Sequence, residues 1–265
     1  MVTVRKINRT GGGPLVSVIT VVLNGEQTIE RTIRSVLDQS YTHLEYIVVD
    51  GGSTDKTLEI IRKFERTNRG RLRFISEPDE GISDAWNKGI RMASGELIGL
   101  INADDWYEKD AIAKIVSCKT DNHTIVCGNV KLWNSSYRYN VKRSSLTRIE
   151  SKMTIWHPGM FCPREVYKQV GLYDSHLKIL MDYDFVVRCY LRDVSFRFID
   201  EEIANMKFGG VSNRLISKSM SEALSVKNKY FGVKIRHFCE YAFYQAYFHA
   251  VIILKKVIYE RVSAC

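Results

Sequence analysis

The sequence runs Leu97-Ile98-Gly99-Leu100-Ile101-Asn102-Ala103-Asp104-Asp105-Trp106 at the point that decides the fold. Its apolar part is short enough for one buried strand, and it ends abruptly in Asn-Ala-Asp-Asp. In an open α/β sheet, ligands bind beyond the carboxyl ends of the strands, so the two aspartates stand where chemistry is expected. Adjacent carboxylates repel one another, and a Mg²⁺ or Mn²⁺ ion between them would relieve that repulsion and grip substrate phosphates. Alternatively, these aspartates only cap a helix that begins near Lys109.

Apolar strands and helical patterns alternate through the N-terminal part of the chain. Strands are predicted at 15–23, 46–50, 72–75 and 97–102. Between them, apolar residues recur at helical spacing from Ile29 to Leu37, from Leu58 to Phe64 and from Ile82 to Ala93. This alternation favours an α/β fold, in which a mostly parallel central sheet is flanked by helices on both faces.

The second predicted strand also ends in an acidic residue at the same edge of the sheet. Asp50 is followed by Gly51-Gly52-Ser53, and the glycines would let backbone N–H groups approach a ligand. The alternative is that Asp50 only serves the turn. The sequence has no G-x-G-x-x-G run after a strand and no Walker-type phosphate loop. Phosphate binding at this edge would therefore need the metal.

The middle of the chain is less regular. Thr124 to Gly128 is predicted as a strand, and residues 131–133 and 137–139 as a hairpin. Pro163 suits the first position of a helix through Val170 that stops at Gly171.

Length, cysteine usage and charge bound the class of protein. A chain of 265 residues is long enough for one large domain or one domain with an appendage. The six cysteines show no C-x-x-C pair, and no secretory signal pattern opens the chain, so reduced thiols in a cytoplasmic protein are expected. Much of the net charge of +9 lies in residues 205–265, which hold ten lysines and arginines against three acids. Such a segment suits nucleic acid, anionic lipid or a phosphorylated substrate.

Five blocks of the sequence, in order and with matching spacing, resemble family 2 glycosyltransferases. The blocks are Val16–Asn24, Ser35–Ser40, Val48–Asp55, Gly81–Gly89 and Ala93–Asp105. The resemblance extends from about Leu15 to about Asn213. It implies a GT-A fold, a nucleotide-sugar donor with UDP as the expected nucleotide, and inversion at the anomeric carbon.

The extent of the resemblance and the composition of the segments on either side of it suggest how the chain is organised. Residues 1–14 would be a flexible leader and residues 15–213 a GT-A catalytic domain. Within that domain, residues 15–105 would form the nucleotide-sugar-binding half and residues 106–213 the acceptor half. Residues 214–265 would form a basic, aromatic-rich helical extension.

Most of the residues that the resemblance singles out concern the donor. The residues that would line the nucleotide pocket or hold the base are Thr20, Asn24, Glu26, Asp50 and Ser53. Those that would lie along the donor, near its sugar or diphosphate, are Asp84, Asn87 and Lys88.

The quoted acidic segment matches the metal-binding motif of the family. Asp104 corresponds to the metal-binding acid of D-x-D, and Asp105 to the acid after it. Asn102 replaces the first acid and is followed by Ala103, so one oxygen ligand is neutral and the Mn²⁺ or Mg²⁺ affinity is expected to be lower. His157 is expected to touch the diphosphate or the metal, the alternative being a packed or solvated histidine.

Ile179 to Arg188 resembles the acidic stretch in which one carboxylate of the family serves as general base. Asp182 takes the place of that acid, and Met181 stands where glutamate is frequent. Asp182 would then accept the proton of an acceptor hydroxyl on a glycan or lipid-linked acceptor, as in cell-surface polysaccharide synthesis. Alternatively, Asp182 only caps a helix, and Asp184 is a first-turn acid favoured by the helix dipole.

The C-terminal segment 238–254 is rich in tyrosine, phenylalanine and isoleucine but is interrupted by Glu240, Gln245 and His249. Because a bilayer span needs about 20 mostly apolar residues, an interfacial helix is predicted instead. Its basic neighbours Lys255-Lys256 would draw it to anionic lipid on the inner face of the plasma membrane. A helix packed on the catalytic domain or in a homodimer interface is an equal alternative.

Two other functions compete with sugar transfer. A sugar nucleotidyltransferase also uses an α/β nucleotide domain with bound Mg²⁺, but Asn24-Gly25-Glu26 lacks the Gly-rich, basic loop expected after its first strand. A nucleic-acid-binding module would explain the basic tail through phosphate neutralisation. The sequence has no zinc spacing, RNA-recognition motif or recognition helix, so nucleic acid is not expected as a partner.

Overall fold

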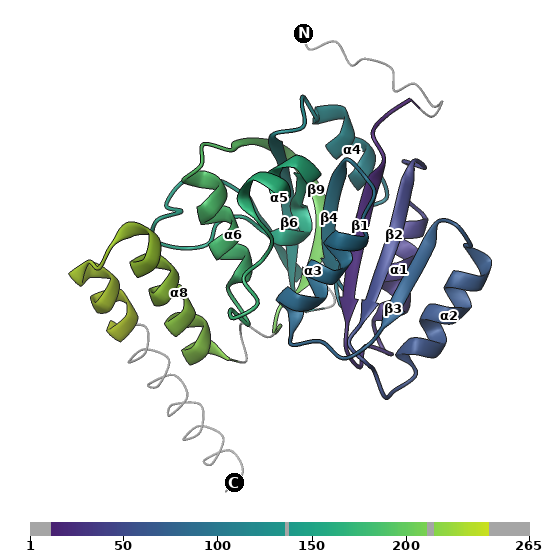
Figure 1. The fold of residues 1–265 in the computed structure, drawn as a ribbon, viewed down its shortest axis with the longest axis horizontal. Helices are drawn as coiled ribbons and strands as arrows, with labels where there is room; N and C mark the ends of the chain where they lie inside the picture. Colours follow the sequence, from purple (N-terminus) through teal and green to yellow (C-terminus); the bar gives the residue numbers. More distant parts are fainter. Residues whose placement is uncertain (1–11, 136–137, 211–214, 244–265) are drawn as a thin grey trace, which may run out of the picture.

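The computed structural model describes residues 12–135, 138–210 and 215–243 (Figure 1). Among these residues, nine strands form one sheet in the order β3-β2-β1-β4-β8-β6-β9-β5, and β7 pairs with β6. Helices cover both faces of this sheet (Figure 1). The predicted α/β fold is therefore confirmed.

The first half of the sheet follows the predicted alternation of strand and helix. Its elements are β1 (Val16–Val22), α1 (Ile29–Leu37), β2 (Leu44–Asp50), α2 (Thr57–Thr67), β3 (Leu72–Ser76), α3 (Ile82–Met92) and β4 (Leu97–Asn102). β1 pairs in parallel with both β2 and β4, and β2 pairs in parallel with β3. The carboxyl ends of β1, β2 and β4 therefore meet at one edge, as the sequence pattern predicts.

The second half of the sheet mixes strand directions. Its elements are β5 (Trp106–Tyr107), α4 (Ala111–Cys118), β6 (Thr124–Ser135), β7 (Arg138–Lys142), the 3₁₀ turn η1 (His157–Gly159), β8 (Met160–Pro163), α5 (Arg164–Val170), α6 (Met181–Tyr190) and β9 (Ser195–Lys207). β8 runs antiparallel to β4, so the start of β8 lies beside the end of β4. The β6–β7 pairing confirms the predicted hairpin.

Two helix termini settle alternatives that the sequence left open. The N-cap residue of α4 is Asp110, so Asp104 and Asp105 do not cap that helix. The N-cap residue of α6 is Leu180, which makes no side-chain capping bond, and Asp182 lies inside the first turn of the helix, so Asp182 is not the N-cap residue. Pro163 ends β8 and directly precedes α5, and Gly171 follows that helix.

The hydrophobic core has two parts, one on each face of the sheet. Side chains of a strand alternate between faces, so Ile19 and Val21 of β1 pack under α3, α5 and α6. Val18 and Val22 pack against α1 and α2, in a cluster that also includes residues of α4. Because β1 and β4 are covered on both faces, the site at their carboxyl ends stands on a rigid base.

The helical extension is described in part. α8 (Ile216–Phe231) packs on α6, with Val226 in the core, and residues 235–243 are helical. The rest of the predicted interfacial segment, 244–265, and most of the predicted leader lie outside the described residues. Within the part of the chain that the structure describes, no helix is long and apolar enough to cross a bilayer, and every cysteine is free.

Candidate active site

A cleft of about 1000 Å³ lies at the carboxyl ends of β1 and β4. Its walls come from segments that are far apart in the sequence, namely 21–28, 79–86, 102–105, 153–157, 178–182 and 206–210. In the strand order, β3 and β8 lie on opposite sides of the β1–β4 pair. Asp79, which follows β3, and His157, which precedes β8, therefore mark opposite ends of the cleft.

The loop after β1 is attached to the turn after β2. The backbone N–H of Asn24 donates to Ser53 Oγ at 2.8 Å, and Ser53 Oγ donates to Asp50 Oδ1 at 2.5 Å. The other Asp50 oxygen accepts from Ser76 Oγ at 2.6 Å. Glu26 lines the cleft, as Asn24 does, and accepts from the backbone of the same turn region. Asp50 is fully buried, so it orders this wall through Ser53 and does not line the cleft.

Two predicted donor-binding residues make contacts within the protein. Thr20 points into the core on the α1 side, where its hydroxyl accepts a hydrogen bond from Tyr46 at 2.9 Å. The Asn87 side chain exchanges two hydrogen bonds with the backbone of Tyr173, at 2.8 and 3.0 Å, and joins α3 to the segment before α6. Both side chains are buried, and neither lines the cleft.

Asp84 and Lys88 form an ion pair on α3, outside the residues that line the cleft. Lys88 Nζ lies 3.4 Å from Asp84 Oδ2 and 2.9 Å from Glu77 Oε1, and it donates to the Pro78 carbonyl at 2.8 Å. These contacts support the turn that carries Asp79 at the rim of the cleft. A direct role along the donor would require the pair to open.

The acidic loop after β4 is held from behind by α1. Arg31 Nη2 donates to the Asp104 carbonyl at 2.9 Å, and its guanidinium lies over the Trp106 ring at 3.5 Å. Thr32 Oγ1 lies 2.6 Å from the Asp105 carbonyl and is able to donate to it. α1 thus engages the backbone of this loop and not its carboxylates, although the buried Asp105 carboxyl also accepts from the backbone of Lys207.

Buried oxygens without partners gather beside the acidic loop. Among the described residues, Asp105 Oδ2 and Asn102 Oδ1 have no hydrogen-bond partner. Burial, and next the charge of Asp104, raise the pKa of Asp105 well above its usual range. Burial lowers the pKa of His157 to about 3, so its ring is neutral and its Nε2 accepts from Asn102 Nδ2 at 3.1 Å. The distance of 3.9 Å between His157 Nε2 and Asp105 Oδ2 is therefore not an ion pair.

The donor set at this loop fits a hard divalent cation that is shared with a diphosphate. Two carboxylates and the amide oxygen of Asn102 are the oxygen ligands that Mg²⁺ and Mn²⁺ prefer. Within the described residues, no group of three or more His, Cys, Asp or Glu side chains is arranged to hold a metal alone. A Mg²⁺ site built from one or two carboxylates plus substrate phosphates needs no such group. His157 Nε2 would have to release Asn102 before it could ligate an ion.

Asp182 reaches the same cleft from the first turn of α6. Burial raises the pKa of its carboxyl to about 6, and the charge of Glu222 adds to this effect. The backbone N–H of Tyr183, which donates to Asp182 Oδ1 at 2.8 Å, opposes it. A carboxylate whose pKa lies close to neutrality is suited to accept a proton from a hydroxyl group.

The sequence reasoning missed several residues at the cleft. Asp79 follows the third strand, and the rule that placed Asp50 and Asp104 at strand ends would have found it. Lys178 lines the cleft and donates to the carbonyls of Glu80 and Ser175 at 2.6 and 3.0 Å, bonds that no local pattern reveals. Arg31 supports the acidic loop, but the sequence pattern shows it only as an ordinary polar residue of a helix.

The chain is similar to known glycosyltransferases. The model of glycosyl transferase family 2 matches residues 17–178. A curated "PGL/p-HBAD biosynthesis glycosyltransferase" from Mycobacterium bovis is 29% identical over 221 residues, which are 82% of this chain and 86% of that protein. The chondroitin synthase of Escherichia coli is 31% identical over 182 residues, which are 66% of this chain and 26% of that protein.

Solved structures share the fold. The mannosyltransferase PcManGT from Pyrobaculum calidifontis, in complex with GDP-Man and Mn²⁺, matches with a TM-score of 0.66 and 21% identity over 90% of this chain and 71% of its own. TarS 1-349 of S. aureus, in complex with UDP-GlcNAc, matches with a TM-score of 0.64 and 19% identity over 84% of this chain and 68% of its own. These likenesses confirm the GT-A fold predicted from the sequence.

Proposed function

Because this chain belongs to glycosyl transferase family 2, we propose that it moves a sugar from a nucleotide-sugar donor to an acceptor hydroxyl with inversion at the anomeric carbon. One observation carries the proposal: Asp104 and Asp105, in the loop after β4, and Asp182, in the first turn of α6, line one cleft of about 1000 Å³. That volume is at the upper end of the range typical of small-molecule sites.

The strand order supports one orientation of the donor. The nucleoside lies toward Asn24 and Asp79, at the ends of β1 and β3, and the diphosphate lies beside Asp104 after β4. Asp104, Asp105 and the Asn102 amide oxygen would hold Mn²⁺ or Mg²⁺, which as a Lewis acid stabilises charge on the departing diphosphate. UDP is the proposed nucleotide, supported by TarS in complex with UDP, and GDP is the competing outcome.

Asp182 is the proposed general base. At neutral pH its carboxyl, with a pKa of about 6, is mostly ionised. It accepts the proton of the acceptor hydroxyl while that oxygen bonds to the anomeric carbon, on the face opposite the diphosphate. The bond between the anomeric carbon and the diphosphate oxygen breaks, and its electron pair leaves with the nucleoside diphosphate. A single displacement of this kind inverts the anomeric carbon.

The acceptor is proposed to be a glycan or lipid-linked oligosaccharide in cell-surface polysaccharide synthesis. The cleft has an apolar wall near its His157 end, lined by Met153, Trp156, Met181, Met206 and Phe208. Phe208 is 60% exposed and lines the cleft, so its ring is accessible to an acceptor. The relative named chondroitin synthase supports a glycan acceptor.

A thermal-shift titration tests the donor. The full chain is heated with UDP or GDP, each with and without Mn²⁺. A nucleotide at about 100 times its dissociation constant adds about 2.7 kcal/mol to the free energy of unfolding, so UDP with Mn²⁺ should raise the melting temperature clearly. Hydrolysis of UDP-sugars to free UDP then tests turnover without a known acceptor. Absence of a shift with either nucleotide would rule out the proposed site.

We also propose that the protein is cytoplasmic and binds the inner face of the plasma membrane through the basic segment 214–265. Flotation with vesicles that contain anionic lipid tests this. The double substitution Lys255→Glu and Lys256→Glu should release the full chain from these vesicles, and neutral vesicles should not bind the unaltered chain. If the unaltered chain did not float with the anionic vesicles, packing of the segment on protein would be favoured instead.

A further inference from the structure

The segment that leads into α6 is held by a residue from far along the chain. Glu222 of α8 accepts the backbone N–H of Lys178 at 3.0 Å through Oε1. Its Oε2 accepts the N–H groups of Ile179 and Leu180, both at 2.9 Å. Leu180 is the N-cap residue of α6, so its N–H is one of the donors that a helix leaves unsatisfied, and Lys178 and Ile179 belong to the segment directly before it. One carboxylate thus fixes three consecutive peptide units directly before Met181.

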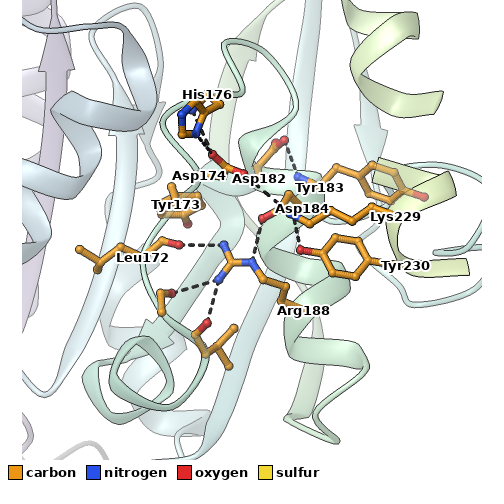
Figure 2. A network of polar contacts seen from close by, with 12 residues as sticks. Leu172, Tyr173, Asp174, His176, Asp182, Tyr183, Asp184, Arg188, Lys229 and Tyr230 are labelled. Atoms are coloured by element: carbon orange, nitrogen blue, oxygen red, sulfur yellow. Dashed lines mark hydrogen bonds and ion pairs between the residues drawn. The ribbon is translucent and has the colours of Figure 1, made fainter. Parts of the chain in front are cut away.

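A second anchor holds α8 against α6 (Figure 2). The Tyr230 hydroxyl donates to Asp184 Oδ1 at 2.8 Å, and Lys229 Nζ lies 3.5 Å from the same oxygen. The other oxygen of Asp184, which is buried, pairs with Arg188 Nε at 2.7 Å. In Figure 2, Asp184 is bonded to Tyr230 of α8, whereas the hydrogen bond drawn at Asp182 runs to the backbone of Tyr183 within α6.

We infer that Glu222 is a positioning residue for the proton transfer, because it fixes the peptide units that place Asp182 in the cleft. The inference rests on the proposed function, in which Asp182 is the base. It goes beyond the family likeness, because the family model ends at residue 178 and α8 begins at Ile216. The negative charge of Glu222 at the N-terminal end of α6 also suits the helix dipole.

Loss of the Glu222 carboxylate should affect both the rate and the stability, and the two effects can be measured apart. A misplacement of about 1 Å in a reacting group costs about 100-fold in rate, and loss of the three hydrogen bonds that Glu222 accepts also lowers the free energy of unfolding. If Glu222 only attached α8 to the rest of the domain, any substitution that weakens the packing of α8 would lower kcat to the same extent. Tyr230 provides that comparison, because its hydroxyl anchors the same helix without touching residues 178–182.

The test uses three full-length variants, Glu222→Ala, Glu222→Gln and Tyr230→Phe. Release of UDP from UDP-GlcNAc, or of GDP from GDP-mannose, is measured with Mn²⁺ to separate kcat from the donor KM. Glu222→Ala should lower kcat by about 10-fold or more and leave the donor KM within about twofold. The kcat of Glu222→Gln should lie between those of Glu222→Ala and the unaltered chain, because the amide oxygen of glutamine still accepts from the backbone of Ile179 and Leu180. Tyr230→Phe should lower the melting temperature and leave kcat within about twofold.

Amide hydrogen exchange supplies a readout that needs no turnover. Residues 178–180 should exchange faster in Glu222→Ala and at the original rate in Tyr230→Phe. Unchanged exchange at these amides, or an equal loss of kcat in Tyr230→Phe and Glu222→Ala, would overturn the inference. If the unaltered chain hydrolysed neither donor, the proposed function would fail, and exchange would still decide whether Glu222 orders this segment.

Discussion

Replacing Asp182 by asparagine removes a proton acceptor and keeps the shape of the side chain. The amide oxygen of the replacement would still accept the N–H of Tyr183, the contact that Asp182 makes at 2.8 Å, so α6 should begin in the same place. Donor binding at the Asp104 end of the cleft should be retained. Loss of a general base typically costs about 10² to 10⁴ in rate, and kcat for donor hydrolysis should fall by that amount.

The pH dependence of kcat gives a more specific prediction. With a pKa of about 6, Asp182 is about nine-tenths ionised at pH 7 and about one-tenth ionised at pH 5. The kcat of the unaltered chain should therefore drop about tenfold over that interval, whereas an ordinary aspartate would leave it flat. The stability effect has the opposite sign. Because burial favours the protonated form in the folded state, the contribution of Asp182 to stability falls as pH rises from about 4 to 6.

The assay is release of the nucleoside diphosphate from pH 4.5 to 8 at saturating Mn²⁺, with melting temperatures recorded at each pH. Nucleotide-induced thermal shifts, measured in parallel, separate loss of binding from loss of chemistry. An Asp182→Asn variant that keeps most of its activity would refute the assignment of the base. So would a flat profile between pH 5 and pH 7 in the unaltered chain.

Three further substitutions probe the rest of the site and its support. Asn102→Asp should lower the melting temperature without metal, because it adds charge beside Asp104 and the buried Asp105. It should also enlarge the rise in melting temperature that Mn²⁺ produces. A smaller rise than in the unaltered chain would contradict the proposed metal ligands. Asp184→Ala leaves Arg188 without its buried partner and should cost about 3 kcal/mol in urea unfolding, and an unchanged midpoint would count against this ion pair. Arg31→Ala frees the loop backbone at Asp104 and should weaken nucleotide binding with Mn²⁺ by about tenfold in calorimetry, while equal affinity would show that α1 does not position the loop.

Local patterns were sufficient to predict the first half of the sheet. Strands and helices there alternate with clear periods of two and about 3.6 residues, and each apolar run ends at the edge where ligands bind. Asp104 follows directly from this rule, whereas Asn24 was assigned through the family resemblance. The same rule placed Asp50 at the right edge but could not tell that Ser53 and Ser76 would bury its carboxylate.

Contacts between segments that are far apart in the sequence cannot be predicted from local patterns. Thr20 and Asn87 were assigned by their place in a motif, and only the packing around Tyr46 and Tyr173 reveals that both serve the core. The role of Glu222 depends on where α8 meets α6, and a single amphipathic helix does not identify its partner. Such roles can be assigned only when the structure shows which two elements pack against each other.

The pairing of β4 with β8 fixes where the acidic loop meets His157. Gly99 stands opposite Phe161 in this pairing, and a Cβ at Gly99 would lie 2.5 Å from the ring of Phe161. A larger residue at this position would favour a register shift of one residue between the two strands. Such a shift turns every side chain of the shifted strand to the other face of the sheet. The meeting of Asn102 with His157 would then be lost although neither residue had changed. A hydrogen atom in the middle of a strand thus governs the alignment of a binding site at its tip.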